Sequence, residues 1–139
     1  MAHGGPDYAL EFAHGYTYSG HPVACAAGLA ALEVLSREKL PAHVAKEAPF
    51  WEGLLHDNLA DKPHVADVRN YGFAGALTLE PYPGEPMRRP FEVAMRMWEK
   101  GFLGRDGGDT IQLAPHFVMQ REQMSSLVGA LSDSLTELA

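Results

Sequence analysis

The sequence predicts an α+β fold, in which a mainly antiparallel sheet is covered by helices and preceded by a loop and a further helix. Two apolar runs rich in strand-forming residues are separated by a short glycine-containing turn, and strands joined in this way pair antiparallel. Helical periodicity recurs before, between and after the predicted strands. The chain has 139 residues, 46% hydrophobic and 21% charged, which suits one globular unit with a buried core.

The first twenty residues are expected to be irregular because glycine and proline punctuate them. A helix is expected to follow over residues 21–36. Pro22 suits its first turn, where the N–H that proline lacks would have no helical partner, and good helix formers come after it.

A second helix is expected over residues 41–59, opened by Pro41. Pro49 lies inside this pattern and is expected to kink or divide the helix. The apolar positions of the segment recur at helical spacing: Val44, Phe50, Trp51, Leu54, Leu55 and Leu59.

Residues 65–80 predict two strands, the first containing Val65 and Val68 and the second covering residues 74–80. Gly72 and Gly75 indicate a tight turn, a bulge or a close approach of the backbone to a neighbour. A proline-rich surface loop is expected over residues 81–90.

The rest of the chain is expected to alternate between helix and strand. A short helix over residues 91–100, closed by Gly101, has four apolar residues at helical spacing: Phe91, Ala94, Met95 and Trp98. Phe102 and Leu103 are expected to begin a strand. Residues 105–109 predict a hairpin turn, residues 110–114 a second strand, and residues 122–138 an amphipathic helix.

Composition excludes several classes of function. A net charge of −7 disfavours nucleic acid and anionic membrane surfaces as partners. No apolar run is long enough to span a bilayer, and the first residues lack the pattern of a signal peptide. Cys25 is the only cysteine, and the histidines lack metal-ligand spacing, so we expect a cytoplasmic protein without a metal.

The loop before the first helix is a candidate anion site. It presents the hydroxyls of Thr17 and Ser19 ahead of a helix start, where unpaired N–H groups and partial positive charge favour a phosphate. The alternative is an ordinary loop whose hydroxyls cap the helix, and spacing alone favours that alternative.

Arg105 is a candidate carboxylate ligand. It lies beside Gly104 and the pair Gly107 and Gly108, which leave its side chain unshielded, and a guanidinium can hold a carboxylate through two parallel hydrogen bonds. The alternative is a surface arginine paired with a neighbouring aspartate, Asp106 or Asp109.

Two stretches carry a family resemblance. Residues 14–27, HGYTYSGHPVACAA, closely resemble a signature of the class III aminotransferases, which use pyridoxal 5′-phosphate (PLP). Residues 98–115, WEKGFLGRDGGDTIQLAP, resemble the C-terminal part of the β-alanine–pyruvate, or ω-amino acid–pyruvate, branch. Other branches carry their substrate arginine at the position of Gln112, which favours the ω-amino acid type here.

The resemblance implies a fold, a cofactor and site residues. The chain would be the C-terminal small domain of a fold-type I PLP transferase. Residues 1–20 would hold the phosphate loop, residues 21–61 a helical connection, and residues 62–139 the α+β small domain. Thr17 would hydrogen-bond the PLP phosphate across a homodimer interface, with Tyr16 as a secondary contact, and Arg105 would hold the substrate carboxylate.

The family's cofactor lysine and the acidic partner of the pyridine nitrogen belong to a large domain upstream of these motifs. The four lysines present do not match the cofactor-lysine motif: Lys39, Lys46, Lys62 and Lys100. We therefore expect this chain alone to be inactive, and to need the large domain and a second subunit as partners, with an amino donor and pyruvate as substrates. The alternative is a free-standing, non-catalytic α+β module that binds another protein.

Overall fold

The computed structural model describes residues 16–138, and the chain divides into two compact units, Met1–Glu38 and Lys39–Ala139. The described part of the first unit contains one helix, α1 (Pro22–Arg37), which begins within one residue of the start expected from the sequence. A turn over residues 16–20 precedes it, and Gly20 has a φ of 79° there. No residue of α1 is buried by the rest of the chain.

The second unit is built on a four-stranded antiparallel sheet in the order β1-β2-β4-β3. β1 (Val65–Tyr71) and β2 (Ala74–Leu79) form one hairpin, and β3 (Arg105–Gly107) and β4 (Thr110–Leu113) form the other. The two hairpins join through β2 and β4. Gly72 turns the first hairpin at a φ of 56° and Gly108 the second at 65°, values that glycine adopts without strain.

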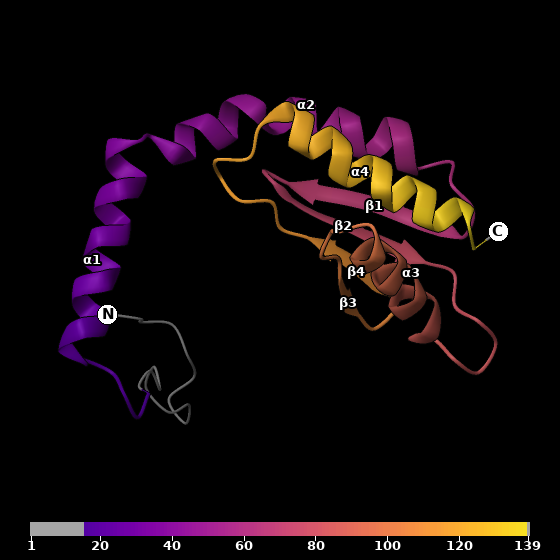
Figure 1. The fold of residues 1–139 in the computed structure, drawn as a ribbon, viewed down its shortest axis with the longest axis horizontal. Helices are drawn as coiled ribbons and strands as arrows, with labels where there is room; N and C mark the ends of the chain where they lie inside the picture. Colours follow the sequence, from indigo (N-terminus) through magenta and orange to yellow (C-terminus); the bar gives the residue numbers. More distant parts are fainter. Residues whose placement is uncertain (1–15, 139) are drawn as a thin grey trace, which may run out of the picture. The chain divides into compact units, whose positions relative to one another are not determined.

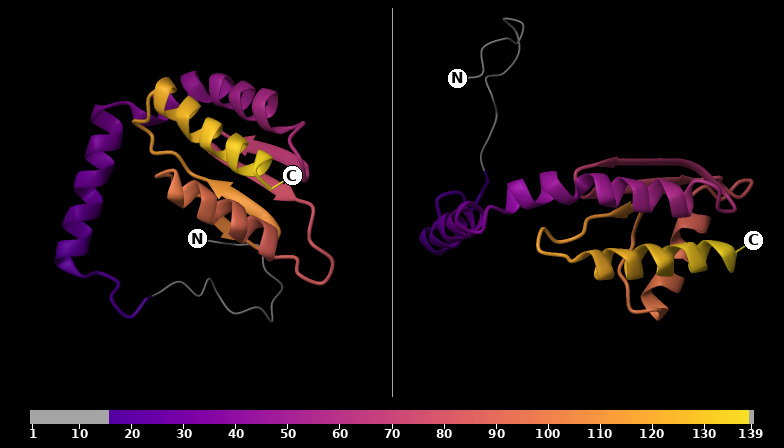
Figure 2. Two further views of the ribbon diagram at one scale, coloured as in Figure 1. Left: turned by 45° about the vertical axis from the view of Figure 1, so that its right-hand side comes forward. Right: turned by 90° about the horizontal axis from the view of Figure 1, so that it is seen from above.

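Three helices cover one face of this sheet: α2 (Leu40–Leu59), α3 (Arg88–Glu99) and α4 (Arg121–Thr136). Figures 1 and 2 show α3 and α4 lying across the strands, with α2 beside α4. The inward side chains of β2 and β4 form one core with the three helices. Its largest fully buried members are Trp51, Leu55, Leu59, Leu77, Leu79, Met97, Ile111, Met124, Leu131 and Leu135.

Gly75 marks a close approach between β2 and α2. A Cβ at this position would lie 2.9 Å from Leu55 Cδ1 and 3.5 Å from a ring carbon of Trp51. Both side chains are fully buried, in a core where an added methyl group would force its neighbours to shift. Of the three interpretations that the sequence allowed for this glycine, the close approach is the one observed.

The predicted strand at Phe102 and Leu103 is wrong, because strand β3 begins only at Arg105. The N–H of Phe102 donates to the Met97 carbonyl at 2.8 Å, and the N–H of Gly101 donates to the Trp98 carbonyl at 2.9 Å. These two bonds, with Gly101 at a φ of 85°, close α3 in a Schellman motif. The start of the predicted strand is therefore used to end the helix.

Two further details bear on the sequence prediction. Of the two outcomes expected at Pro49, a kink or a division of the helix, the division is not observed, because α2 continues through Pro49 to Leu59. Pro49 and the residue four before it, Ala45, are both exposed, so water can reach the carbonyl that loses its helical partner. α3 begins at Arg88, within the predicted loop.

Candidate functional site

The face of the sheet that the helices leave open brings Arg105 and Gln112 side by side. Arg105 on β3 is the direct cross-strand partner of Gln112 on β4, which in turn pairs with Ala76 on β2. Ala76 pairs with Arg69 on β1, so one row of side chains crosses all four strands. Directly paired residues point to the same face of a sheet, which places Gln112 beside the candidate arginine.

Arg105 is the one arginine of the seven that makes neither a hydrogen bond nor an ion pair within residues 16–138. The other six all have partners there: Arg37, Arg69, Arg88, Arg89, Arg96 and Arg121. An exposed guanidinium without a partner is free to bind an external carboxylate through two hydrogen bonds.

The aspartates that offered an alternative partner for Arg105 are placed elsewhere. Asp106 is the next residue along β3, so its side chain points to the opposite face. Asp109 accepts a hydrogen bond from the Thr110 hydroxyl at 2.8 Å. The interpretation of Arg105 as half of a surface ion pair is therefore wrong for this structure.

A polar network extends from Arg69, the β1 member of this row, to neighbouring residues of the sheet. Arg69 Nη1 donates to Asp67 Oδ2 at 2.6 Å and to Thr78 Oγ1 at 2.7 Å. The Thr78 hydroxyl lies 3.5 Å from that of Thr110, at the base of the turn between β3 and β4. The network links the first hairpin to the hairpin that carries Arg105.

Gln112 extends along β3 in the direction away from Arg105. A Cβ placed on Gly107 would lie 3.0 Å from Gln112 Nε2, so the amide rests over the glycine backbone. Because Gly107 has no side chain, the Gln112 amide can lie over its backbone, on the side away from the Arg105 guanidinium.

The Thr17 segment forms a tight turn ahead of α1. Ser19 Oγ accepts the N–H of Tyr16 at 2.8 Å, and the N–H of Ser19 donates to the Tyr16 carbonyl at 2.9 Å. Ser19 therefore closes the turn, and Thr17 at its tip is exposed. No described side chain caps α1, and no acidic residue lies in its first turn.

This arrangement fits a phosphate better than the alternative of hydroxyls that cap the helix. The Cys25 N–H donates to the His21 carbonyl, whereas the helix start has no side-chain acceptor among the described residues. A phosphate oxygen would find an exposed hydroxyl at Thr17 and the positive end of a 16-residue helix in the same unit. Tyr16 is exposed beside it.

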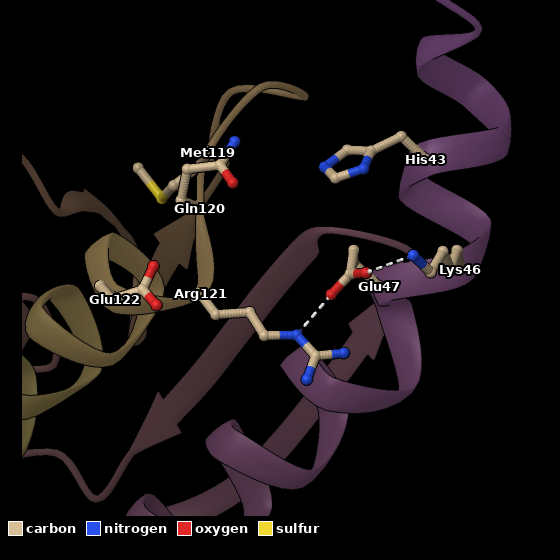
Figure 3. A pocket seen from close by; sticks show the side chains of 7 residues that line it. All are labelled: His43, Lys46, Glu47, Met119, Gln120, Arg121 and Glu122. Carbon is tan, nitrogen blue, oxygen red and sulfur yellow. Dashed lines mark hydrogen bonds and ion pairs between the residues drawn. The ribbon is translucent and has the colours of Figure 1, made fainter.

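A pocket of about 270 Å³ in the second unit lies where α2 faces the start of α4 (Figure 3). Its central contact joins residues 74 positions apart: Arg121 Nε donates to Glu47 Oε2 at 2.6 Å. Lys46 lies 3.7 Å from the other oxygen of Glu47, and the Arg121 guanidinium stacks 4.5 Å from the ring centre of Phe50. Neither Glu47 nor Arg121 is assigned to a site by the sequence analysis.

The signal for Glu47 was its spacing. It lies four residues before Trp51 on the face of α2 that packs into the core, and its side chain is only 10% exposed. An acidic residue at a core-facing helical position requires a cationic partner. The Glu47–Arg121 pair joins α2 to α4, and it serves the fold rather than the chemistry at Arg105.

The hydrogen bond from Arg121 holds the pKa of Glu47 below the ordinary value of 4.5, against the opposing effect of burial. Because the folded-state pKa is lowered, we expect the pair's contribution to stability to be complete above about pH 4.5 and to be lost as the pH falls through the folded-state pKa. Urea denaturation across that range checks this, with Glu47→Gln expected to flatten the pH dependence.

Glu92 is the necessary comparison for that experiment, because hydrogen bonds from Arg88 and Tyr82 also lower its pKa. Glu92→Gln should remove its own share of the acid sensitivity and leave that of Glu47 in place. If the free energy of unfolding of Glu47→Gln falls as steeply at acid pH as that of the original chain, the acid sensitivity does not come from Glu47.

A family model described as aminotransferase class III matches residues 3–135 of the chain. Structural comparison agrees. A transaminase from directed evolution by ancestral reconstruction superposes with a TM-score of 0.79 and 31% identity, over 91% of this chain and 29% of that one. A PLP-bound aminotransferase mutant from Vibrio fluvialis superposes with a TM-score of 0.79 and 30% identity, over 92% of this chain and 29% of that one.

The chain therefore belongs to the class III aminotransferases. Within that family it is 48% identical over 134 residues to the β-alanine–pyruvate aminotransferase of Pseudomonas aeruginosa, covering 96% of this chain. It is 47% identical to the ω-amino acid–pyruvate aminotransferase of Pseudomonas putida, again over 96% of the chain. It spans only 30% and 29% of the lengths of these two relatives. In residues 16–138, no helix is long and apolar enough to cross a membrane.

Proposed function

We propose that this chain contributes the substrate-carboxylate and cofactor-phosphate contacts of an ω-amino acid–pyruvate aminotransferase. In that reaction an amino group passes from β-alanine, or a similar ω-amino acid or amine, through PLP to pyruvate. The observation that carries the proposal is that Arg105 has no partner within residues 16–138 and is exposed beside a neutral Gln112 on the open face of the sheet. Both Pseudomonas relatives are named as aminotransferases of pyruvate, which carries a carboxylate.

Arg105 has the role of binding and orienting the substrate. Its guanidinium would donate two hydrogen bonds to the carboxylate of β-alanine in one half of the reaction, and to the carboxylate of pyruvate in the other. A substrate held at its carboxylate has its amino or keto carbon at a fixed distance from the arginine. The neutral amide of Gln112 adds no second charge that would select a dicarboxylate.

Thr17 has the role of an anchor for the cofactor phosphate, with the start of α1 supplying favourable partial charge and Tyr16 a secondary contact. When bound, PLP supplies the electron sink on which the amino group is moved. We keep three stretches, a phosphate loop over residues 1–20, a helical connection over residues 21–61 and a small domain over residues 62–139, and add that α2 of the connection packs into the core of the small domain. The large domain and a second subunit of a homodimer would complete the site.

The chain by itself is expected not to catalyse transamination, because none of its four lysines matches the family's cofactor-lysine motif. Mixed with PLP and β-alanine, it should produce no alanine from pyruvate and no visible absorption band that borohydride reduces. The matched measurement uses the chain joined to the upstream part of a class III relative. Activity of the isolated chain above that of free PLP would contradict this expectation.

In the joined polypeptide, Thr17→Ala should weaken PLP retention about 10- to 100-fold, because one hydrogen bond to a charged phosphate is lost. Dialysis against a PLP-free buffer followed by absorbance measures this. Thr17→Ser keeps the hydroxyl and should retain the cofactor. If both variants lose PLP equally, the hydroxyl is not the contact.

A free-standing module that binds another protein stays the second candidate, and the exposed aromatic residues Tyr16 and Tyr18 are what favour it. Under that proposal the isolated chain would be a stable monomer whose thermal unfolding ignores PLP and responds to a protein partner.

A further inference from the structure

The hairpin that carries Arg105 also carries a carboxylate on the same face of the sheet. Gly107 lies two residues after Arg105 on β3, and it pairs directly with Thr110 on β4. Residues two apart on a strand share a face, and so do directly paired residues, which places the Thr110 side chain on the open face with that of Arg105. The Thr110 hydroxyl donates to Asp109 Oδ1 at 2.8 Å. The Asp109 carboxylate is therefore on the arginine's side of the sheet.

A carboxylate in this place would ordinarily pair with Arg105. The two residues are four positions apart on one hairpin, their charges attract, and the arginine side chain is long and flexible. Gly107 lies between them and has no side chain to keep them apart. Arg105 nevertheless makes no hydrogen bond or ion pair within residues 16–138. A contact of the turn must therefore hold the Asp109 carboxylate away from the guanidinium.

Two contacts fix Asp109. Its carboxylate accepts the Thr110 hydroxyl, and its backbone carbonyl accepts the N–H of Leu79 at 2.8 Å. Thr110 is only 7% exposed, so its hydroxyl has little access to water and depends on this acceptor. A hydrogen bond from a fixed donor to a charged acceptor outweighs an ion pair between exposed side chains, because the ion pair must order two flexible groups and is screened by solvent. The contact with Thr110 is therefore favoured over pairing with Arg105.

Neighbouring side chains direct the Thr110 proton towards Asp109. Arg69 Nη1 donates to Thr78 Oγ1 at 2.7 Å, so this oxygen acts as an acceptor towards β1. The Thr78 proton can then point to the Thr110 oxygen, 3.5 Å away, which leaves the proton of Thr110 for the carboxylate. Each hydroxyl thus accepts one hydrogen bond and donates the next, in a chain that runs from β1 to the turn of the β3–β4 hairpin.

We propose that Thr110 is a positioning residue, which keeps Arg105 available to the substrate by holding the Asp109 carboxylate. The proposal rests on the carboxylate-binding role proposed above for Arg105. Without the Thr110 hydroxyl, the Asp109 carboxylate becomes an internal competitor for the guanidinium. A substrate carboxylate then has to displace it before binding, whereas a donor without a carboxylate does not. Thr110 thus acts on substrate selection only through Asp109 and Arg105.

The first test measures the reactivity of arginine side chains in the isolated chain. Phenylglyoxal modifies free guanidinium groups faster than paired ones, and peptide mass mapping gives a separate rate for each arginine. Arg37 is the internal reference, because it lies in the first unit and its side chain is 69% exposed. Relative to Arg37, Thr110→Val should lower the rate at Arg105 about 2- to 5-fold, the range expected for an exposed ion pair. Salt at about 1 M should remove the difference by screening that pair.

Two further variants separate this effect from general damage to the hairpin. Thr110→Ser keeps the hydroxyl and should retain the original rate at Arg105. Thr110→Val combined with Asp109→Asn removes the competing carboxylate and should restore the rate, with Asp109→Asn alone as its reference. A second substitution would not repair lost packing, so a double variant as slow as Thr110→Val would overturn the proposal, as would an unchanged rate in Thr110→Val. Thr110→Ala repeats the measurement if circular dichroism shows that Thr110→Val does not fold.

The same variants in the joined polypeptide test the consequence for substrates. Thr110→Val should lower kcat/KM for β-alanine about 2- to 5-fold and slow the single turnover of an arylalkylamine much less, and the double variant should recover the loss. A selective loss in Arg105→Ala, together with no effect of Thr110→Val, would overturn the role of Thr110 alone. Equal losses for both donors in Arg105→Ala would overturn the carboxylate role of Arg105 itself.

Discussion

Replacing Arg105 with alanine, in the chain joined to its upstream part, should lower kcat/KM for β-alanine and for pyruvate by about 10²- to 10³-fold. Two charge-assisted hydrogen bonds to a carboxylate are worth about 3–4 kcal/mol together, which corresponds to that factor in rate. Steady-state kinetics with varied β-alanine, and then varied pyruvate, measure the two effects separately.

The control for Arg105→Ala is a donor without a carboxylate. The half-reaction with a simple arylalkylamine, followed in a single turnover so that pyruvate is not needed, should be almost unchanged. Arg105→Lys keeps the charge and loses the planar fork, so its losses should be intermediate. Equal losses for β-alanine and for the arylalkylamine would show that the variant damages the site in general, and would remove Arg105 from the carboxylate role.

Replacing Trp51 with alanine should destabilise the second unit by about 3–5 kcal/mol. Trp51 is fully buried where α2 meets β2. Gly75 has no Cβ, and this leaves room for the Trp51 ring and the Leu55 side chain to pack against β2. A domain of this size has a total stability of about 5–15 kcal/mol, so the variant loses a large share of it. Urea denaturation followed by far-ultraviolet circular dichroism measures the change.

The matched control is Trp98→Ala in the isolated chain. The same residue type is removed from an exposed position, and the expected change is within about 0.5 kcal/mol. If the two tryptophan variants lose similar stability, the core does not lie where α2 meets the sheet.

Most of the fold follows from local patterns. Pro22 marks the start of α1, because proline suits the first turn of a helix, where the N–H that it lacks would have no helical partner. The paired apolar runs at residues 65–80 give the first hairpin, with Gly72 at its turn. The start of β3 was not predicted correctly because of the preceding helix, α3. The N–H groups of Gly101 and Phe102 donate to carbonyls at the C-terminus of α3 and are not available to a strand.

The same division holds for the candidate site. Thr17 and Arg105 are candidates because the short motifs around them resemble those of the family, whereas spacing alone favoured an ordinary helix-capping loop at Thr17. Glu47 escaped prediction, since its partner Arg121 lies 74 residues away and nothing local links the two.

The sequence by itself determined the order of the elements, the family and the two residues proposed to touch cofactor and substrate. All of these are carried by contiguous stretches, in which residue spacing dictates geometry. Only the tertiary structure decided that Arg105 lies beside Gln112 on an open sheet face, that it alone of the seven arginines lacks a partner within residues 16–138, and that Trp98 is exposed on α3. Each of these depends on which distant segments pack together. That packing is decided by the burial of apolar side chains from all of the elements in a common core, and no short stretch of sequence contains this information.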